Sequence, residues 1–490
     1  MLIAVAAMGA AVLVLVAALL IVFAGYRAFD LIVLGFLATV AMFLSRFNSN
    51  FAIEIMDRPY VGFHWYMLIA MTILLGLRGL VHHRPPLRLG GIVLMAGAFA
   101  VLSLLSGLFN GGGVGLSAAI QVLVIALGPL LLAALIVDLM PRTEATSSRL
   151  RLTFILLIGV LIPSITIMFS IAPNALGSFL GWSAMAASRQ TGFVRGWSPL
   201  GSSGSTGLVM VMAYALAMHE VIGNRKRWHI IVLFLVGLAI LFMLARAVLV
   251  MFLLFHLIYF ASAIRRAPGR VLGLAVVCAA VGVPVIIKLQ ERYSFERFGL
   301  VGGASDEIRA SSAIAAIEAS AQNPLLGSGP GLLYEEIRTE WLMPRVEGAG
   351  RKVTIIENRS SAMEPHNVYL LVAAEHGWPA ALLFVAIMFL IWRRVRRARL
   401  LPDARSRSMA AAWSAGWISA AVMLLTASAP LVNPQTAVFF WFFAFIGLHW
   451  RVTAMEQEWD YETPVEQDAA EDALAYYDGH AGVLMDTAAR

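Results

Sequence analysis

Long apolar runs recur along almost the whole chain, and they constrain its fold more than any other feature. A transmembrane helix needs about 20 consecutive, mostly apolar residues, and the chain holds roughly 12 or 13 runs that approach this length. They cover Ile3–Phe23, Leu31–Leu44, Val61–Leu77, Leu89–Leu108, Leu116–Val137, Leu152–Ile171, Gly207–Ile222, Ile230–Leu244, Val248–Ile264, Val271–Ile287, Val368–Ile391, Met409–Thr426 and Val438–Trp450. Only 13% of the 490 residues are charged, about half the fraction that is usual in soluble domains. The sequence therefore predicts an all-α polytopic membrane protein.

Two features of these runs have a simple interpretation. Ile3–Phe23 has no basic segment before it and no obvious small-residue cleavage site, so we expect a membrane helix there rather than a signal peptide. Cys278 is the only cysteine and lies inside an apolar run. It can form no internal disulfide, and we expect a packing residue.

Basic residues gather in alternate loops and predict the orientation of the chain. The intervening connections, such as Asn110–Val114 and Ser428–Pro434, carry none. Because cytoplasmic loops of membrane proteins are enriched in Lys and Arg, the basic loops are predicted to be cytoplasmic. The net charge of +7 follows mostly from this topology, and short basic loops against the membrane do not indicate a nucleic-acid partner. The basic loops hold Arg78, Arg84 and Arg88; Arg142, Arg149 and Arg151; Arg225, Lys226 and Arg227; Arg265, Arg266 and Arg270; and Arg393, Arg394, Arg396, Arg397 and Arg399.

This orientation divides the chain into four predicted parts. Residues 1–287 form membrane helices with a shorter outer loop at 172–206, residues 288–365 form a large outer loop, and residues 366–450 form the C-terminal membrane helices. Residues 451–490 form a cytoplasmic tail that is acidic and poor in large apolar side chains. Disorder is the default expectation for such a tail.

The large outer loop has the pattern of a folded, partly helical segment. Ser305 is suited to cap a helix whose first turn holds Asp306 and Glu307, two acids that favour the positive end of the helix dipole. Apolar residues then recur at helical spacing, and Asn323-Pro324 predicts the end of the helix. The apolar stripe consists of Ala310, Ile314, Ile317 and Ala321, and Arg309 lies off it.

A glycine-rich segment, Gly327-Ser328-Gly329-Pro330-Gly331, follows this helix. A nucleotide phosphate loop is not indicated, because no Gly-Lys-Ser/Thr follows and no predicted strand precedes it. We interpret the segment as a structural turn.

A histidine stands where the large loop is predicted to enter the membrane. Pro365-His366-Asn367 opens the apolar run Val368–Ile391, and Glu375-His376-Gly377 follows within it. With an unperturbed pKa near neutrality, a histidine can accept a proton at working pH, so His366 is the first catalytic candidate. His376 would lie mostly on another face of the helix, and we interpret it as a packing residue.

Three arginines outside the basic loops are candidates for binding an anion. Arg246 separates two apolar stretches at the outer end of a predicted helix, where topology does not require a positive charge. Snorkelling to the head groups is the alternative for Arg246. Arg189 and Arg195 lie in the shorter outer loop beside Phe193 and Trp197. Anchoring at the membrane interface is the alternative for both.

Three motifs follow one another in this order: Arg246 at a helix junction; Arg309 followed by Asn323-Pro324, Gly327 and Gly329; and His366-Asn367 followed by Glu375 and Gly377. The order resembles the O-antigen ligase and O-antigen polymerase superfamily of bacterial membrane glycosyltransferases. The resemblance covers about residues 189–391. Two departures are Met243-Leu244-Ala245, in place of a Ser/Thr-x-Ser segment, and Pro379-Ala380, where the family often has a second glycine.

The resemblance implies a donor, an acceptor and a set of site residues. Enzymes of this family take glycan from an undecaprenyl-diphosphate-linked donor in the bacterial inner membrane and transfer it to an acceptor hydroxyl on the periplasmic face. By this resemblance His366 would be the base, and Arg246 and Arg309 would bind the leaving diphosphate, with Arg189 and Arg195 as further candidates. Attack opposite the leaving group would invert the anomeric carbon, and no metal or other cofactor is implied. The supporting residues would be Asn367, Glu375, Gly327 and Gly329.

Other functions are compatible with a polytopic chain. A transporter or flippase would carry ionisable residues along its spans and paired broken helices, whereas the spans here are almost free of charge. A peptidoglycan polymerase would use an outer-loop carboxylate, for which Glu335, Glu336, Glu340 and Glu364 are candidates. Within the favoured family, a ligase and a polymerase of lipopolysaccharide or exopolysaccharide differ in the acceptor. Lipid A-core, a protein side chain and another lipid-linked repeat all remain open.

Overall fold

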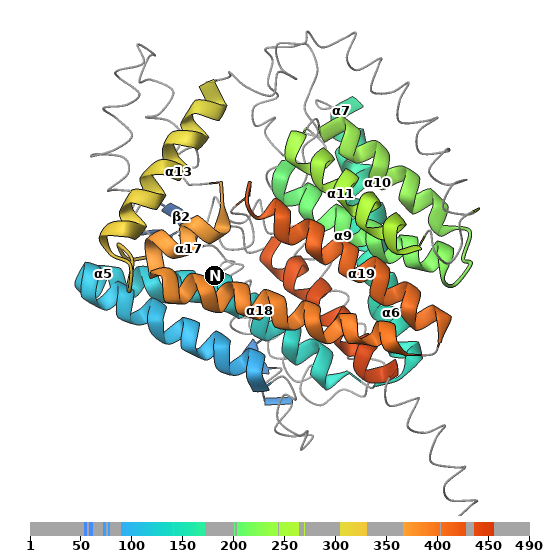
Figure 1. Cartoon of the computed structure of the whole chain (residues 1–490), viewed down its shortest axis with the longest axis horizontal. Helices are drawn as coiled ribbons and strands as arrows, with labels where there is room; N and C mark the ends of the chain where they lie inside the picture. The colour runs from blue at the N-terminus through green and yellow to red at the C-terminus, as the bar shows by residue number, and fades with distance from the viewer. Residues whose placement is uncertain are drawn as a thin grey trace, which may run out of the picture.

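The computed structural model describes a helical bundle formed by the middle and C-terminal parts of the chain (Figure 1). The predicted spans Ile3–Phe23, Leu31–Leu44 and Val271–Ile287 lie outside the described residues, as do Arg189 and Arg195. The described residues are 53–55, 58–61, 72–74, 77–78, 90–140, 142–171, 200, 203–243, 245–263, 269, 304–330, 366–401, 403–427 and 436–454.

Five helices in these ranges are long and apolar enough to cross a membrane, which confirms the prediction of an all-α polytopic membrane protein. They are Gly91–Asn110, Glu144–Ser170, Ser203–Ile222, Trp378–Leu400 and Thr436–Ala454. Shorter apolar helices cover Leu127–Ile136, His229–Met243 and Ala247–Ser262. A short antiparallel hairpin of β1 (Ile53–Ile55) and β2 (Arg58–Val61) was not predicted.

The helices carry the following labels in chain order: α5 (Gly90–Leu139), α6 (Glu144–Phe154), the π-helix η1 (Ile155–Leu161), α7 (Ile162–Ile171), α9 (Ser203–Ile222), α10 (His229–Met243), α11 (Arg246–Ala263), α13 (Ala304–Gln322), α17 (Val368–His376), α18 (Trp378–Arg396), the 3-10 helix η6 (Arg397–Leu400) and α19 (Ala404–Met423). We call the end of the bundle at which α18 passes through η6 into α19 the arginine-rich end.

α5 covers two of the predicted spans and reverses direction within its length. Near its start, Gly91 lies beside Arg394 at the arginine-rich end. Further on, Asn110 donates a hydrogen bond to the carbonyl of Gly327 at 3.0 Å, beyond the other end of α18. Just after α5, Glu144 is again at the arginine-rich end. Figure 1 draws the two halves of α5 as a blue run and a cyan run.

The apolar run that begins at Val368 forms two helices. α17 ends at His376 and α18 begins at Trp378, and Gly377 between them has a φ of 85°. Pro379 lies in the first turn of α18, where its missing N–H costs no helical hydrogen bond. The prediction of one continuous span over Val368–Ile391 is therefore wrong.

α9 is buried along almost its whole length at the centre of the bundle, where it packs against η1, α10, α11 and α19. Gly207 of α9 allows close approach to Val248 of α11, as small residues commonly do between membrane helices. Trp413 and Trp417 of α19 stack on one another and on Phe443. The indole N–H of Trp413 donates to the carbonyl of Phe443 at 2.9 Å, so the aromatic core is also satisfied in hydrogen bonds.

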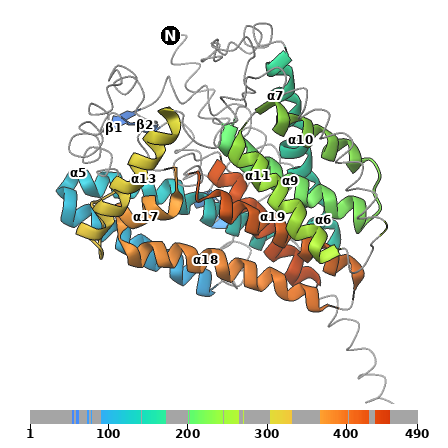
Figure 2. The same cartoon turned by 45° about the horizontal axis from the view of Figure 1, so that its top comes forward.

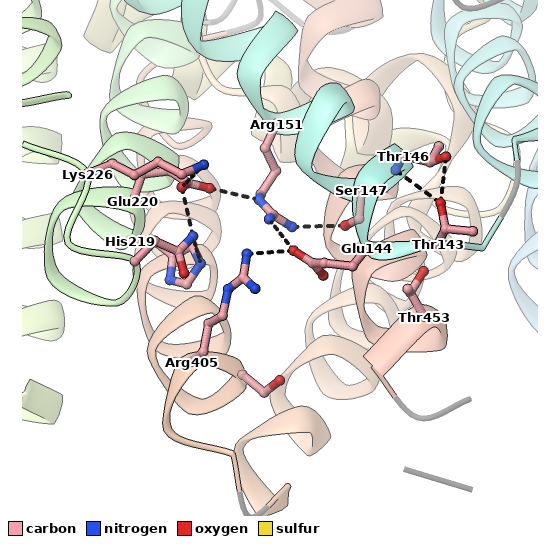
Figure 3. Close-up of polar contacts among 12 residues, drawn as sticks. Thr143, Glu144, Thr146, Ser147, Arg151, His219, Glu220, Lys226, Arg405 and Thr453 are labelled. Atoms are coloured by element: carbon pink, nitrogen blue, oxygen red, sulfur yellow. Dashed lines mark hydrogen bonds and ion pairs between the residues drawn. The ribbon is translucent and has the colours of Figure 1, made fainter. Parts of the chain in front are cut away.

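A buried ion network joins three helices at the arginine-rich end (Figure 3). Arg151 of α6 donates through Nε to Glu220 of α9 at 3.1 Å and through Nη2 to Glu144 at 3.0 Å. Arg405 of α19 pairs with Glu144 at 2.6 Å, and Lys226 pairs with Glu220 at 3.1 Å. Basic loops that the sequence placed on one side of the membrane therefore meet at one end of the bundle.

Candidate active site

His366 lies immediately before α17, beside the residue that caps this helix. The Oδ1 atom of Asn367 accepts hydrogen bonds from the backbone N–H groups of Tyr369 and Leu370, at 3.0 and 3.1 Å. The cap satisfies two N–H groups that the start of a helix leaves without an intrahelical partner. His366 itself is half-buried, and the cap fixes the backbone that follows it.

The start of α17 is held on the end of α19 that lies away from the arginine-rich end. The N–H of Val368 donates to the carbonyl of Leu424 at 2.9 Å. The hydroxyl of Tyr369 donates to the carbonyl of Ala421 at 2.8 Å. Because backbone and side chain both contribute, the position of His366 is set by the end of α19.

The other end of α17 is joined to a glycine-rich turn, residues 324–330, within the large loop. Three backbone hydrogen bonds link the turn to the junction of α17 with α18, and they satisfy carbonyl and N–H groups that helix ends leave free. We call the turn together with residues 374–378 the α17–α18 corner. The three bonds run from the N–H of Ser328 to Ala374 (2.8 Å), from that of Gly329 to Glu375 (3.1 Å) and from that of Trp378 to Pro324 (2.9 Å).

Glycines allow this close backbone contact. Gly327, Gly329 and Gly377 have φ values of 67°, 103° and 85°, which residues with a side chain rarely adopt. A Cβ at Gly327 would lie 2.5 Å from the carbonyl carbon of Glu375, and one at Gly377 would collide with the carbonyl of Leu325. The turn thus docks the large loop on α17.

α13 packs on α17 (Figures 1 and 2). Small side chains of α13 are buried, rather than those of the predicted apolar stripe. Ile314 and Ile317 of that stripe are 48% and 50% exposed. Position 309 of α13 is three residues before Ser312 and seven before Ala316, and both of these residues are buried. Among the side chains of α13 that the structure describes, the buried ones are Ser312, Ala315, Ala316, Ala319 and Ser320.

Arg246 is the first residue of α11 and follows the break after Met243, where α10 ends. The predicted helix junction is therefore present. The side chains of Arg246 and Arg309 are not among those described. α11 packs along α19, so the helix that begins with Arg246 and the helix that follows His366 share α19 as a neighbour.

Three polar side chains of α5 reach the α17–α18 corner, and none of them was predicted as a site residue. Ser106 Oγ donates to the carbonyl of Glu375 at 2.8 Å, and Asn110 Nδ2 donates to a carbonyl of the turn at 3.0 Å. Ser103 Oγ and Nδ1 of His376 share a hydrogen bond of 2.7 Å. Their spacing of i, i+3 and i+7 in an apolar run puts them on one helix face, and this was the signal available in the sequence.

Glu375 and His376 are both buried in the corner. Oε2 of Glu375 lies 3.9 Å from Nε2 of His376, and the ring of Phe99 lies 5.6 Å from the imidazole. His376 is therefore packed in the interior, at the opposite end of α17 from His366. Among the side chains that the structure describes, no group of three or more His, Cys, Asp or Glu is placed to hold a metal ion.

Comparison with known families identifies the region that contains this site. A family model described as O-antigen ligase matches residues 199–385. The match contains Arg246, Arg309, the turn and His366, whereas α5 precedes it. A comparison with curated proteins finds no match.

Proposed function

Residues 199–385 belong to the O-antigen ligase family, and from this premise we propose that the chain is a membrane glycosyltransferase. The donor is a glycan linked to undecaprenyl diphosphate, and the acceptor is a hydroxyl group of a second glycan or of lipid A-core. The reaction breaks the bond between the anomeric carbon and the diphosphate oxygen and forms a bond to the acceptor oxygen. It needs a base for the acceptor proton and positive charge for the leaving diphosphate.

The observation that carries the proposal is the place of His366 within the matched region. It is half-buried in front of a capped helix whose first residues are fixed on the end of α19, far from the arginine-rich end. There a histidine can meet a lipid-linked donor from the membrane and an acceptor from the water. A ring nitrogen of His366 takes the proton of the acceptor hydroxyl as its oxygen attacks the anomeric carbon.

Arginines supply positive charge for the departing diphosphate. Negative charge grows on the diphosphate as the glycosidic bond breaks, so a guanidinium that contacts its oxygens stabilises the transition state more than the bound donor. The planar guanidinium also matches phosphate oxygens in pairs. We assign this role to Arg309 and Arg246, with Arg189 and Arg195 as further candidates. Attack from the side opposite the diphosphate inverts the anomeric carbon.

The orientation of the site follows from the two ends of the bundle. By the positive-inside rule the arginine-rich end faces the cytoplasm. His366, the large loop (288–365) and the shorter loop (172–206) then lie on the periplasmic face of the bacterial inner membrane. The acidic tail (451–490) lies in the cytoplasm.

Glycan profiling of a deletion strain tests this function and separates its two forms. The strain is complemented with the wild type, with His366→Ala or with Leu382→Ala, a control at an exposed apolar position of α18. We expect the wild type and the control to restore the product and His366→Ala to fail.

The product that fails identifies the reaction. Loss of capped lipopolysaccharide with intact lipid-linked polymer indicates a ligase. Loss of long polymer with accumulation of single lipid-linked repeats indicates a polymerase. Restoration by His366→Ala, or no change in either product on deletion, contradicts the proposal.

A further inference from the structure

The polar face of α5 (Ser103, Ser106 and Asn110) lies outside the region that matches the family, yet all three side chains bond to residues inside it. Each contacts a different group of the α17–α18 corner. Ser103 bonds to the ring of His376, while Ser106 and Asn110 donate to backbone carbonyls. The contacts therefore fasten both the end of α17 and the glycine-rich turn to one helix.

The hydrogen bonds of Ser103 and Ser106 matter because these two side chains lie in the apolar interior, whereas Asn110 and parts of the corner such as Leu325 are exposed. Ser103 and Ser106 are fully buried, and His376 is 1% exposed. In such surroundings a lost partner is not replaced by water, so removing the Ser103 hydroxyl leaves Nδ1 of the buried His376 without this hydrogen bond. The carbonyl of Glu375 still accepts from the N–H of Gly329 when the Ser106 hydroxyl is removed. A movement of the corner that lets the unsatisfied ring nitrogen find another partner would then lower the free energy.

A shift of the corner would reach the proposed base through α17. This helix has nine residues, about 14 Å at 1.5 Å per residue, and it leads from the corner to Asn367 and His366. The turn, which is part of the corner, also follows directly after α13, the helix that carries Arg309. One set of contacts thus fixes both the helix that follows the base and the helix that bears a proposed donor-binding arginine.

We infer that the polar face of α5, together with His376, is a positioning element that sets the distance between His366 and α13. The inference rests on the proposed glycosyltransferase function for its kinetic consequence. His376 is a positioning residue, because it is buried at the far end of α17 from His366. Since a misplacement of about 1 Å can cost on the order of 100-fold in rate, the effect appears in turnover rather than in donor binding.

Kinetics of the purified full-length protein test the inference. Ser103→Ala and Asn110→Ala are expected to lower kcat by about tenfold or more, with the KM for the lipid-linked donor changed less than about twofold. The double variant should lose less than the product of the two single losses, because both act on one corner. Val101→Ala, at an exposed position of α5, is the control and should keep the wild-type kcat.

A conservative series at position 376 separates positioning from chemistry. His376→Gln retains groups that can hydrogen-bond to Ser103 and should keep more activity than His376→Leu, with an unchanged pH–rate profile. Loss of a limb of that profile in an active His376→Gln would make His376 the base and overturn the inference. A kcat that falls only in proportion to the folded fraction would overturn it too.

A distance measurement gives a readout that does not depend on the reaction. Because Cys278 is the only cysteine, spin labels can be placed at Ile317→Cys on α13 and Leu382→Cys on α18 in a Cys278→Ser background. We expect one narrow distance distribution in the parent and a shifted or broadened one after Ser103→Ala or Asn110→Ala.

The two readouts fail in different ways. Unchanged distances together with unchanged kcat overturn the inference. Altered distances in a protein whose parent transfers no glycan would support the positioning contact and contradict the proposed function instead.

Discussion

Gly377 lets two chain segments that are far apart in the sequence touch through their backbones. Its φ is 85°, and a Cβ there would collide with the carbonyl of Leu325. With a ψ of 163° the backbone lies in a region essentially restricted to glycine, where a residue with a side chain costs on the order of 1–3 kcal/mol, and relief of the collision requires the turn to move away from α17. Position 377 therefore has to be glycine for the corner to form.

Gly377→Ala is expected to destabilise the purified protein by about 2 kcal/mol or more, the sum of backbone strain and the lost contact. Gly97→Ala in α5 is the matched control, because a Cβ there meets no heavy atom within 4 Å. Alanine is favoured over glycine in a helix by up to about 1 kcal/mol, so the control should be neutral or stabilised. Thermal unfolding in one detergent compares the two, and equal Tm values would contradict the close packing of the corner.

Asn367 acts on His366 through the backbone. Asn367→Ala removes the oxygen that caps α17, which should cost about 1 kcal/mol and lower the rate of glycan transfer by loosening the residue before the cap. Asn367→Asp keeps an acceptor oxygen and should retain most of the rate. Transfer per folded molecule measures the difference, and indistinguishable rates for the two variants would rule out a role of the cap.

Among the elements, α6, α9 and α19 are tied together by the ion network at the arginine-rich end. Glu220 is 2% exposed and accepts from Arg151, Lys226 and Asn224. A buried carboxylate of this kind is stable only while its partners are in place. The network therefore specifies how the three helices meet, more than it adds net stability.

Glu220→Ala leaves Arg151 buried with one carboxylate partner fewer and should destabilise the protein by about 3–5 kcal/mol. Glu144→Ala also takes a carboxylate from Arg151, but the Glu144 side chain is 32% exposed, so water can replace it and the loss should be nearer about 1 kcal/mol. Denaturation of both variants in detergent gives the comparison. A smaller loss for Glu220→Ala than for Glu144→Ala would contradict the buried network.

The start of α19 gives a pH-dependent test of an element outside the membrane spans. Burial raises the pKa of Asp403, but hydrogen bonds from the N–H groups of Ser406 and Arg405 and the charge of Arg405 outweigh it and hold the pKa below its ordinary value. The stabilisation is thus complete above the ordinary pKa of about 3.9 and is lost as the pH falls through the lowered value. Asp403→Asn keeps a capping oxygen, so its unfolding should depend less on pH between about 5 and 2. Equal acid sensitivity would exclude this contribution.

The sequence predicted those elements whose signals are local. α13 ends at Gln322, as Asn323-Pro324 indicated, but it begins at Ala304, so Ser305 lies inside the helix and the prediction of Ser305 as its cap is wrong. The helix after His366 begins at Val368, where Asn367 caps it. The break at Gly377 was missed, although Pro379 just after it was a usable signal. Apolar character is nearly continuous across the break, and hydropathy alone does not register a change of helix direction.

The candidate site was predictable only in part, because some of its residues have no local sequence signal. His366 could be predicted because it is a polar residue immediately before the apolar run that begins at Val368. The roles of Ser103 and His376 depend on a contact between residues 273 positions apart, which no local pattern reveals. The face by which α13 packs was also unexpected, because small residues such as Ala316 allow closer approach than the larger residues of its apolar stripe.

Considered as a whole, the molecule has two differently organised ends. At the arginine-rich end, charges are paired between helices, and the pair of Arg151 with Glu220 is buried. At the other end of the bundle, α19 fixes the start of α17, and the large loop and α5 fix its end. The region that matches the family therefore depends on a helix from the N-terminal part of the chain to complete the packing at the far end of α17, the helix that follows its proposed base.

Glycan transfer by purified His366→Ala tests the role of His366 as the base. Wild-type and variant proteins in lipid nanodiscs receive the same undecaprenyl-diphosphate-linked glycan and acceptor, and product is followed in a single turnover while donor binding is measured separately. Loss of the base should slow transfer by about 100-fold or more with donor binding within about twofold of the wild type. Product formation by His366→Ala at close to the wild-type rate would contradict the account.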